Sequence, residues 1–287
     1  MTDIHWIKNA IGIWLRDFQS IFRTIIIQMM IRAKNRYFSG VPTVIIFIPT
    51  GSITTCTRVR RMSGKSMKTI QYIIFDMDGT LLDSLTDLQN TLNYCFGKVG
   101  FPERNYQEVR SFVGNGLRKL IERAVPKGTS EKKIDEILVM FKEYYMVHCA
   151  DFTAPYEGVV DMLRDLKGKG YKMAIVSNKA DEALKVLSGQ FFGEYIEVAI
   201  GERQGMNKKP APDLVYLAME ELGADKDNTV YVGDSEVDYQ TAVNSGLKCI
   251  SVLWGFRDRE LLEVYGADCF AGSPQEVVKM LEDKILC

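Results

Sequence analysis

Two carboxylates stand two residues apart at Asp76 and Asp78, directly after the apolar run Gln71–Phe75. Such a run suits a buried parallel strand, so both acids would lie at the end of that strand. Like charges held this close resist ionisation. A divalent cation would relieve the repulsion and leave one carboxylate free to attack an electrophile. The alternative is an ordinary loop in which the aspartates only form turns.

Polar side chains follow a second apolar run at Ser177 and Asn178, in Ala174-Ile-Val-Ser-Asn-Lys. A hydroxyl and an amide at the end of a strand can donate hydrogen bonds to phosphate oxygens. The same pair could instead cap a helix that starts near Asp181.

A cation with a fixed direction is predicted at Lys209, because Pro210 and Pro212 stiffen the chain after it and precede a helix. An ammonium group at this place could neutralise a phosphate and a carboxylate nucleophile together. The alternative is a solvated surface lysine.

Asp234 ends a third apolar run, Val230–Gly233, and Asp238 lies one helical turn further on. One turn of helix brings both carboxylates to the same face, so both could face one cation. The alternative is an acidic helix start, which the helix dipole favours.

The elements that must position these residues alternate between strands and helices along most of the chain. Further strands are predicted near 172–176, 195–199, 229–232, 248–252 and 268–271, and helices near 159–167, 181–187, 213–222, 237–244 and 275–284. This repetition predicts an α/β fold with a doubly wound (Rossmann-like) parallel sheet. In such sheets, ligands bind outside the carboxyl ends of the strands.

The stretch 84–154 interrupts this alternation. Its apolar residues recur at helical spacing, as at Leu88 and Leu92, and no strand pattern occurs in it. We expect an all-helical cap domain at 84–154, inserted into a core formed by 67–83 and 155–287.

Residues 1–66 carry ten Lys and Arg against two Asp and Glu, a net charge of +8, whereas the rest of the chain carries −9. This segment has two apolar runs, within 4–29 and at 43–48, and neither reaches the roughly 18 uncharged apolar residues needed to span a bilayer. The segment could form a basic amphipathic helix on a membrane surface, or pack on the body or on another copy. We favour a third interpretation, a non-native or poorly ordered extension read through from a misassigned start, with the natural protein beginning at Met62 or Met67.

Composition disfavours several kinds of chemistry. The chain has two histidines, which argues against a zinc site and against a Ser-His-Asp mechanism. The acidic body argues against nucleic-acid binding. Six scattered cysteines without a CxxC pair fit reduced thiols in the cytoplasm. We therefore expect carboxylates and a lysine to perform the chemistry.

Together, the four sets of polar residues resemble the motifs of the haloacid dehalogenase (HAD) superfamily, in its phosphoglycolate phosphatase-like branch with a helical cap. The resemblance covers roughly residues 67–287, and the motifs occur in the family's order. It implies that Asp76 is the nucleophile, Asp78 the general acid and base, and Lys209 the charge-balancing lysine.

The resemblance also implies a phosphate site and a Mg²⁺ site. Ser177 and Asn178 would bind the phosphate group, with Lys209 beside them. The implied Mg²⁺ ligands are Asp76, the backbone carbonyl of Asp78, Asp234 and, as a ligand or as a group that orients metal-bound water, Asp238.

The acid at Asp78 separates this chain from the dehalogenases of the family, because an alkoxide leaving group needs a proton and a halide does not. We expect a Mg²⁺-dependent phosphatase that hydrolyses a small organic phosphomonoester through an aspartyl-phosphate, with 2-phosphoglycolate as the first candidate. The alternatives are a sugar phosphomutase, a pyrophosphatase or a nucleotidase of the same family. A non-enzymatic binding module is disfavoured because no motif acid is missing. No nucleic-acid partner is expected, membrane contact depends on residues 1–66, and the oligomeric state stays open.

Arg118 is the candidate for substrate recognition in the cap. It follows the glycine turn Gly114-Asn-Gly116, and similar turns in relatives lean over the active site. Its guanidinium could reach a substrate carboxylate. The alternative is a glycine turn followed by a surface arginine.

Overall fold

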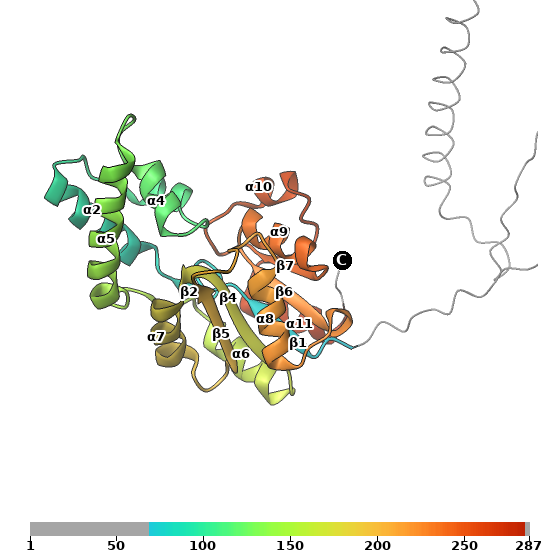
Figure 1. Ribbon diagram of the computed structural model, residues 1–287. Coiled ribbons are helices and arrows are strands. Elements are labelled where there is room, and N and C mark those ends of the chain that lie inside the picture. The colour runs from blue at the N-terminus through green and yellow to red at the C-terminus, as the bar shows by residue number, and fades with distance from the viewer. Residues whose placement is uncertain (1–68, 285–287) are drawn as a thin grey trace, which may run out of the picture. The chain divides into compact units, whose positions relative to one another are not determined.

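The computed structural model describes residues 69–284 (Figure 1), so the predictions for residues 1–66 lie outside the described part. Within it, six parallel strands form one sheet in the order β5-β4-β1-β6-β7-β8. The strands are β1 (Tyr72–Phe75), β4 (Lys172–Ala180), β5 (Val198–Glu202), β6 (Thr229–Gly233), β7 (Lys248–Val252) and β8 (Phe270–Ala271). The chain adds β4 and β5 on one side of β1 and the later strands on the other. The predicted doubly wound parallel sheet is confirmed.

Strand β1 lies in the middle of the sheet because it is apolar throughout, with Ile73, Ile74 and Phe75 fully buried. Phe75 pairs with Ile175 of β4 on one side and with Val232 of β6 on the other. Strands β1 and β6 therefore end almost level, whereas β4 continues past this register to Ala180. The residues after β1 and β6 and those in the last part of β4 meet at the switch point of the strand order, where ligands of such sheets bind.

Helices cover both faces of the sheet, because side chains of a buried strand point alternately to either side. Ile73 and Phe75 pack in the larger core, whereas Ile74 and Val176 pack in a second core on the opposite face. The larger core contains side chains of α6 (Val159–Gly168), α7 (Asp181–Phe192) and α11 (Pro274–Glu282), and the second core contains those of α8 (Asp213–Leu222) and α9 (Glu236–Ser245).

Four helices lie between β2 (Leu82–Asp83) and β3 (Ala154–Pro155), which pair with each other as short antiparallel strands. They gather in one group in Figure 1, where α2 packs against α5 and α4 packs against α5. The β2–β3 pair places the entry and the exit of this insertion side by side. The helices are α2 (Leu85–Val99), α3 (Tyr106–Phe112), α4 (Leu117–Ala124) and α5 (Glu131–His148). Their separation from the core as a cap domain stays a prediction.

The structure differs from the expected elements in several places, and both β4 and α7 continue past their expected ends at 176 and 187. The strand expected at 195–199 starts at Val198, because Tyr195 and Ile196 still donate backbone hydrogen bonds to Phe192 at the end of α7. Helix α3 was not expected, although Asn105 and Glu108 form a capping box at its start. The short helix α10 (Arg259–Val264) was also missed. No helix of the described residues is long and apolar enough to cross a membrane.

Candidate active site

Asp76 is the first residue after β1, and its backbone N–H still donates to the carbonyl of Val232 at 2.9 Å. The sheet therefore fixes where its side chain starts. Carboxylate Oδ1 accepts a hydrogen bond from the N–H of Met77 at 2.7 Å and lies 2.8 Å from Nζ of Lys209. Burial raises the pKa of Asp76 to about 7, with the charge of Asp238 acting in the same direction and Lys209 opposing it.

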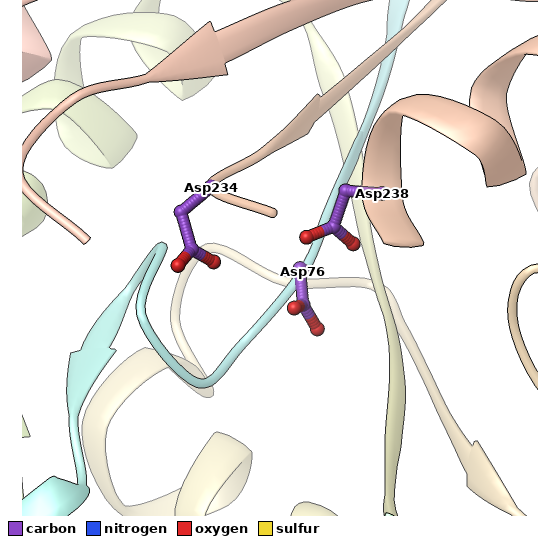
Figure 2. Close-up of side chains that lie close together, drawn as sticks. All are labelled: Asp76, Asp234 and Asp238. Carbon is purple, nitrogen blue, oxygen red and sulfur yellow. The ribbon is translucent and has the colours of Figure 1, made fainter. Parts of the chain in front are cut away.

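Three buried carboxylates, those of Asp76, Asp234 and Asp238, lie close together at the carboxyl ends of β1 and β6 (Figure 2). One oxygen from each lies within 4.8 Å of the others. Asp234 follows β6 and accepts hydrogen bonds from Oγ1 of Thr80 at 3.1 Å and from the N–H of Phe256 at 2.8 Å. Burial, with the charges of Asp238 and Asp76, raises the pKa of Asp234 well above its ordinary value.

Asp238 lies in the first turn of α9, and its carboxylate accepts four hydrogen bonds. Oδ1 receives them from Nζ of Lys209 at 2.7 Å and from the hydroxyl of Tyr231 at 3.1 Å. Oδ2 receives them from the N–H of Ser235 at 3.1 Å and from its hydroxyl at 2.5 Å. In this arrangement Asp238 holds Lys209 and the helix start, whereas Asp76 and Asp234 keep more of their lone pairs free.

Lys209 is 3% exposed and contacts three oxygen atoms. Its ammonium lies between Asp76 and Asp238 and also donates to the hydroxyl of Tyr231 at 3.1 Å. Burial lowers the pKa of Lys209, but the charges of Asp238 and Asp76 outweigh it, so the pKa is raised and the group stays protonated. Tyr231 was not expected in the site, since its position inside an apolar strand gave no sign of a polar role.

Asn178 has both of its amide hydrogens engaged. Nδ2 donates to the carbonyl of Gly114 at 3.2 Å and to the carbonyl of Lys209 at 3.0 Å. Turning the amide over would set Oδ1 against two carbonyl oxygens, so this orientation is fixed. The side chain therefore joins the lysine loop to the turn before α4, and in this arrangement it has no donor left for a phosphate.

Ser177 is 3% exposed, and its Oγ accepts the N–H of Lys179 at 3.4 Å. Its hydroxyl hydrogen has no acceptor among the residues that the structure describes, so it can donate to a ligand. Oδ1 of Asn178 is also buried, and it has no hydrogen-bond partner among the described residues. The structure thus brings one ready donor, rather than the expected pair, to this end of β4.

One pocket collects most of the predicted site residues. Its polar lining contains Asp76, Asp78, Ser177, Asn178, Lys179, Lys209, Asp234, Ser235 and Arg257. The insertion supplies an apolar wall opposite the strand ends, formed by Leu88, Val113, Leu117 and Leu120. Asp238 lies behind Lys209 rather than on the pocket surface. A small ligand in this pocket would therefore contact both the strand ends and the helical insertion.

The chain is similar to a known protein family and to several solved structures. Residues 73–252, more than half of the chain, match the model of the haloacid dehalogenase-like hydrolases. This chain belongs to that family. The predicted family and the prediction of a hydrolase are confirmed.

Several relatives of this HAD-like hydrolase carry the name phosphoglycolate phosphatase. The one from Aquifex aeolicus (strain VF5) is 30% identical over 218 residues, which is 76% of this chain and 99% of that protein. The one from Caulobacter vibrioides is 32% identical, over 72% of this chain and 89% of that protein.

Solved structures show the same fold. A protein from Lactobacillus delbrueckii subsp. bulgaricus is 34% identical, has a TM-score of 0.71 and covers 74% of this chain and 98% of its own. CbbY from Rhodobacter sphaeroides, in complex with phosphate, is 26% identical with a TM-score of 0.60, covering 73% of this chain and 96% of that one.

The residues of this HAD-like hydrolase fit a divalent cation. The carboxylates of Asp76, Asp234 and Asp238 outnumber the one ammonium among them. Burial, and after it the charges of the neighbouring carboxylates, raises the pKa of Asp76 and of Asp234. Hard oxygen ligands are those that Mg²⁺ prefers, and a divalent cation would offset the excess charge. Asp76 and Asp234 are the side chains best placed to hold it.

Gly79 and Gly255 lie so close to the side chain of Asp234 that neither position has room for a side chain of its own. A Cβ at Gly79 would lie 2.4 Å from Oδ2 of Asp234, and one at Gly255 would lie 2.4 Å from its Cβ. Gly79 also has φ of +88°, which glycine adopts at low cost. Two glycines thus form the cradle in which this carboxylate lies.

Arg118 is not among the residues of the pocket. Its guanidinium is engaged on the surface with Glu122 at 2.9 Å, with Glu131 at 2.5 Å and with Asp135. Neighbouring positions of a helix differ by about 100° in direction, so Leu117 faces the pocket while Arg118 turns toward α5. The structure therefore gives no support to the predicted substrate contact of Arg118.

The arginine that does line the pocket is Arg257, which was missed. It comes from the loop after β7, pairs with Glu236 at 2.9 Å, and donates to the carbonyls of Arg110 at 2.9 Å and Val113 at 2.7 Å. Its position directly after the aromatic loop Trp254–Phe256 was the available signal, since a strand end is where such sheets bind ligands. Arg257 therefore ties the core to the turn that walls the pocket.

Proposed function

We propose that this HAD-like hydrolase is a Mg²⁺-dependent phosphatase, a phosphoric monoester hydrolase that forms an aspartyl-phosphate on Asp76. The observation that carries the proposal is the buried ion pair between Asp76 and Lys209, at 2.8 Å, with a second acid, Asp78, on the same pocket. A phosphatase of this kind needs a carboxylate nucleophile, a cation to balance the transferred group and an acid for the leaving oxygen.

The first half of the proposed reaction transfers the phosphoryl group. An oxygen of Asp76 forms a bond to phosphorus while the bond from phosphorus to the ester oxygen breaks, and Asp78 gives its proton to that oxygen. Lys209 offsets charge on the transferred oxygens, and Ser177 donates a hydrogen bond to one of them. Bound Mg²⁺ would offset the remaining negative charge of the phosphoryl group.

The second half releases phosphate. Asp78 takes a proton from a water molecule, whose oxygen bonds to phosphorus as the bond to Asp76 breaks. The products are inorganic phosphate and the free enzyme, with Asp78 protonated for the next cycle. A mutase would instead return the phosphoryl group to a second hydroxyl of the substrate.

We propose 2-phosphoglycolate as the first substrate to test, because relatives at 30% to 32% identity bear the name phosphoglycolate phosphatase. We keep the cytoplasm as the proposed location. Its support is that Cys95, Cys149 and Cys249 are unbridged thiols in the described part of the chain.

The test is release of phosphate from a panel of small esters, nucleotides, pyrophosphate and a sugar 1-phosphate, each with Mg²⁺ and with a chelator. The proposal expects phosphate release from a small ester that the chelator abolishes and added Mg²⁺ restores. An isomerised sugar phosphate without free phosphate would identify a mutase instead. Preferential cleavage of pyrophosphate or of nucleotides would overturn the small-ester assignment.

A further inference from the structure

Lys179 is a buried lysine that the proposed reaction leaves without a role. It follows Asn178 near the end of β4 and is 5% exposed. Its ammonium donates to Oδ1 of Asp78 at 2.9 Å and to Oδ2 at 3.2 Å. A buried lysine is costly unless it is paired, and here the carboxylate of Asp78 supplies the opposite charge.

The third partner of Lys179 belongs to the helical insertion. The ammonium donates to the hydroxyl of Tyr145 on α5 at 2.6 Å and lies 4.8 Å from the centre of its ring. Tyr145 is 2% exposed and packs against Phe141, whose ring centre is 5.6 Å away. An ammonium has three hydrogens, and these contacts occupy all of them.

The remaining partner of Asp78 is Ser84, at the start of α2, whose hydroxyl donates to Oδ1 at 2.6 Å. The side chain of Asp78 is 20% exposed on the pocket, so without Lys179 a single hydrogen bond would fix it. Two groups thus determine where the carboxyl group points, Lys179 of β4 and Ser84 at the start of α2, and Tyr145 of α5 holds Lys179 in turn. Ser84 is near Asp78 in sequence, whereas Lys179 reaches it only through the fold.

We propose that Lys179 is a positioning residue that directs the carboxyl group of Asp78 toward the leaving oxygen. Because the hydroxyl of Tyr145 holds Lys179, the position of Asp78 also depends on how the insertion packs. The inference rests on the proposed function, in which Asp78 is the acid. A proton donor has to lie within hydrogen-bond reach of the oxygen that it protonates, so a carboxyl group free to rotate would lose efficiency. The effect should therefore depend on how much the leaving group needs a proton.

The experiment compares kcat/KM on two substrates, an alkyl phosphate (2-phosphoglycolate or the best alkyl ester of the panel) and p-nitrophenyl phosphate, whose leaving group hardly needs protonation. For Lys179→Met we expect the ratio of alkyl to nitrophenyl activity to fall by about tenfold or more. Lys179→Arg, which keeps a charged donor, should recover part of that ratio. Tyr145→Phe removes one hydroxyl and should lower the ratio in the same direction by about two- to fivefold.

Lys185→Met is the matched control, because Lys185 also pairs with an aspartate, Asp181 at 2.8 Å, but is 58% exposed on α7. It should leave both activities unchanged. Equal losses on both substrates in the Lys179 variants, or an unchanged ratio, would overturn the proposal, because a merely structural lysine affects both alike. If Lys179→Met does not fold, Tyr145→Phe decides, and an unchanged ratio in that variant contradicts the proposal.

Asp78→Asn separates the two possible failures. If it loses the alkyl activity selectively while Lys179→Met does not, the acid role stands and the positioning role of Lys179 is wrong. If wild-type protein releases no phosphate, or Asp78→Asn changes both activities equally, the proposed function or its acid is wrong, and the role of Lys179 falls with it.

Discussion

At the scale of single residues, the reactivity of Asp76 is set by what surrounds it. Asp76 is 8% exposed and lies close to two other buried acids, so its carboxyl group ionises less readily than that of a solvated aspartate. The nearby ammonium of Lys209 opposes this effect without cancelling it. The group is therefore poised to lose its proton when a cation binds.

We expect the affinity for Mg²⁺ to fall as pH drops below about 7, because burial raises the pKa of Asp76 to about 7 and a bound cation must displace that proton. The raised pKa of Asp234 acts in the same direction. The apparent dissociation constant should rise about tenfold per pH unit for each proton displaced. Isothermal titration at pH values between 5.5 and 7.5 measures it, and a constant affinity over this range would contradict the charge balance described for the cluster.

Gly79→Ala should damage both the fold and the cation site. A Cβ at Gly79 would lie 2.4 Å from Oδ2 of Asp234, at a φ of +88°. We expect a loss of about 2–4 kcal/mol in the free energy of unfolding, from the left-handed backbone and the overpacking together, with weaker Mg²⁺ binding. Urea denaturation and titration calorimetry measure the two effects.

Gly100→Ala is the control for this prediction. Gly100 has φ of +71°, but a Cβ there would meet no atom within 4 Å. It should lose only the backbone part, about 1–2 kcal/mol, and bind Mg²⁺ normally. Equal behaviour of the two variants would show that the cradle around Asp234 has no steric role.

At the scale of secondary-structure elements, much of the fold could be read from the sequence. Helix α8 and strand β7 have the predicted bounds, Asp213–Leu222 and Lys248–Val252. The ends of α8 are marked in the sequence by Pro212 before it and Gly223 after it. Strand β5 was displaced because an aromatic run continues from α7 into the loop, and apolar content alone does not show where a helix turn ends.

The helix α3 and the β2–β3 pair show the limit of that approach. Helix α3 has seven residues, so its apolar spacing at Tyr106, Val109 and Phe112 covers only about two turns and is too short to identify a helix. Strands β2 and β3 have two residues each and pair across the whole insertion, from Leu82 to Pro155. Pairing over that distance is a property of the folded chain rather than of either segment.

Arg257 should control how the insertion meets the core, because it donates to the carbonyls of Arg110 and Val113 while it pairs with Glu236. Arg257→Lys keeps the charge but cannot make this fork of contacts. We expect KM to rise about three- to tenfold with a smaller change in kcat, because the turn that walls the pocket is held less firmly. Steady-state kinetics on the best ester measures it.

Arg259→Lys is the comparison for Arg257→Lys. Arg259 makes an exposed ion pair with Glu263 at 2.8 Å, which contributes little. The KM of the Arg259→Lys enzyme should equal that of the wild type. A KM of Arg257→Lys that also stays at the wild-type value would show that the core contact does not shape the pocket.

At the scale of the whole molecule, the site is assembled from segments that are far apart in the chain. The central part of the site could be predicted from the parallel sheet, because residues that follow neighbouring strands must lie close together, as Asp76 and Asp234 do. The contacts between insertion and core were not predictable in this way. Lys179 and Arg257 acquire their partners only when the helices pack over the strand ends, and the rotation of α4 that turns Arg118 away is likewise a result of that packing.

The central claim, that Asp76 carries the phosphoryl group, is tested most directly by rapid-quench mass spectrometry of the protein during turnover of the best ester with Mg²⁺. The account predicts a transient mass increase of one phosphoryl group that maps to Asp76. Asp76→Asn should lack this increase, lose about three or more orders of magnitude in kcat, and keep the wild-type melting behaviour. A phosphoryl group on another residue, or an Asp76→Asn enzyme that retains activity within about tenfold of the wild type, would contradict it.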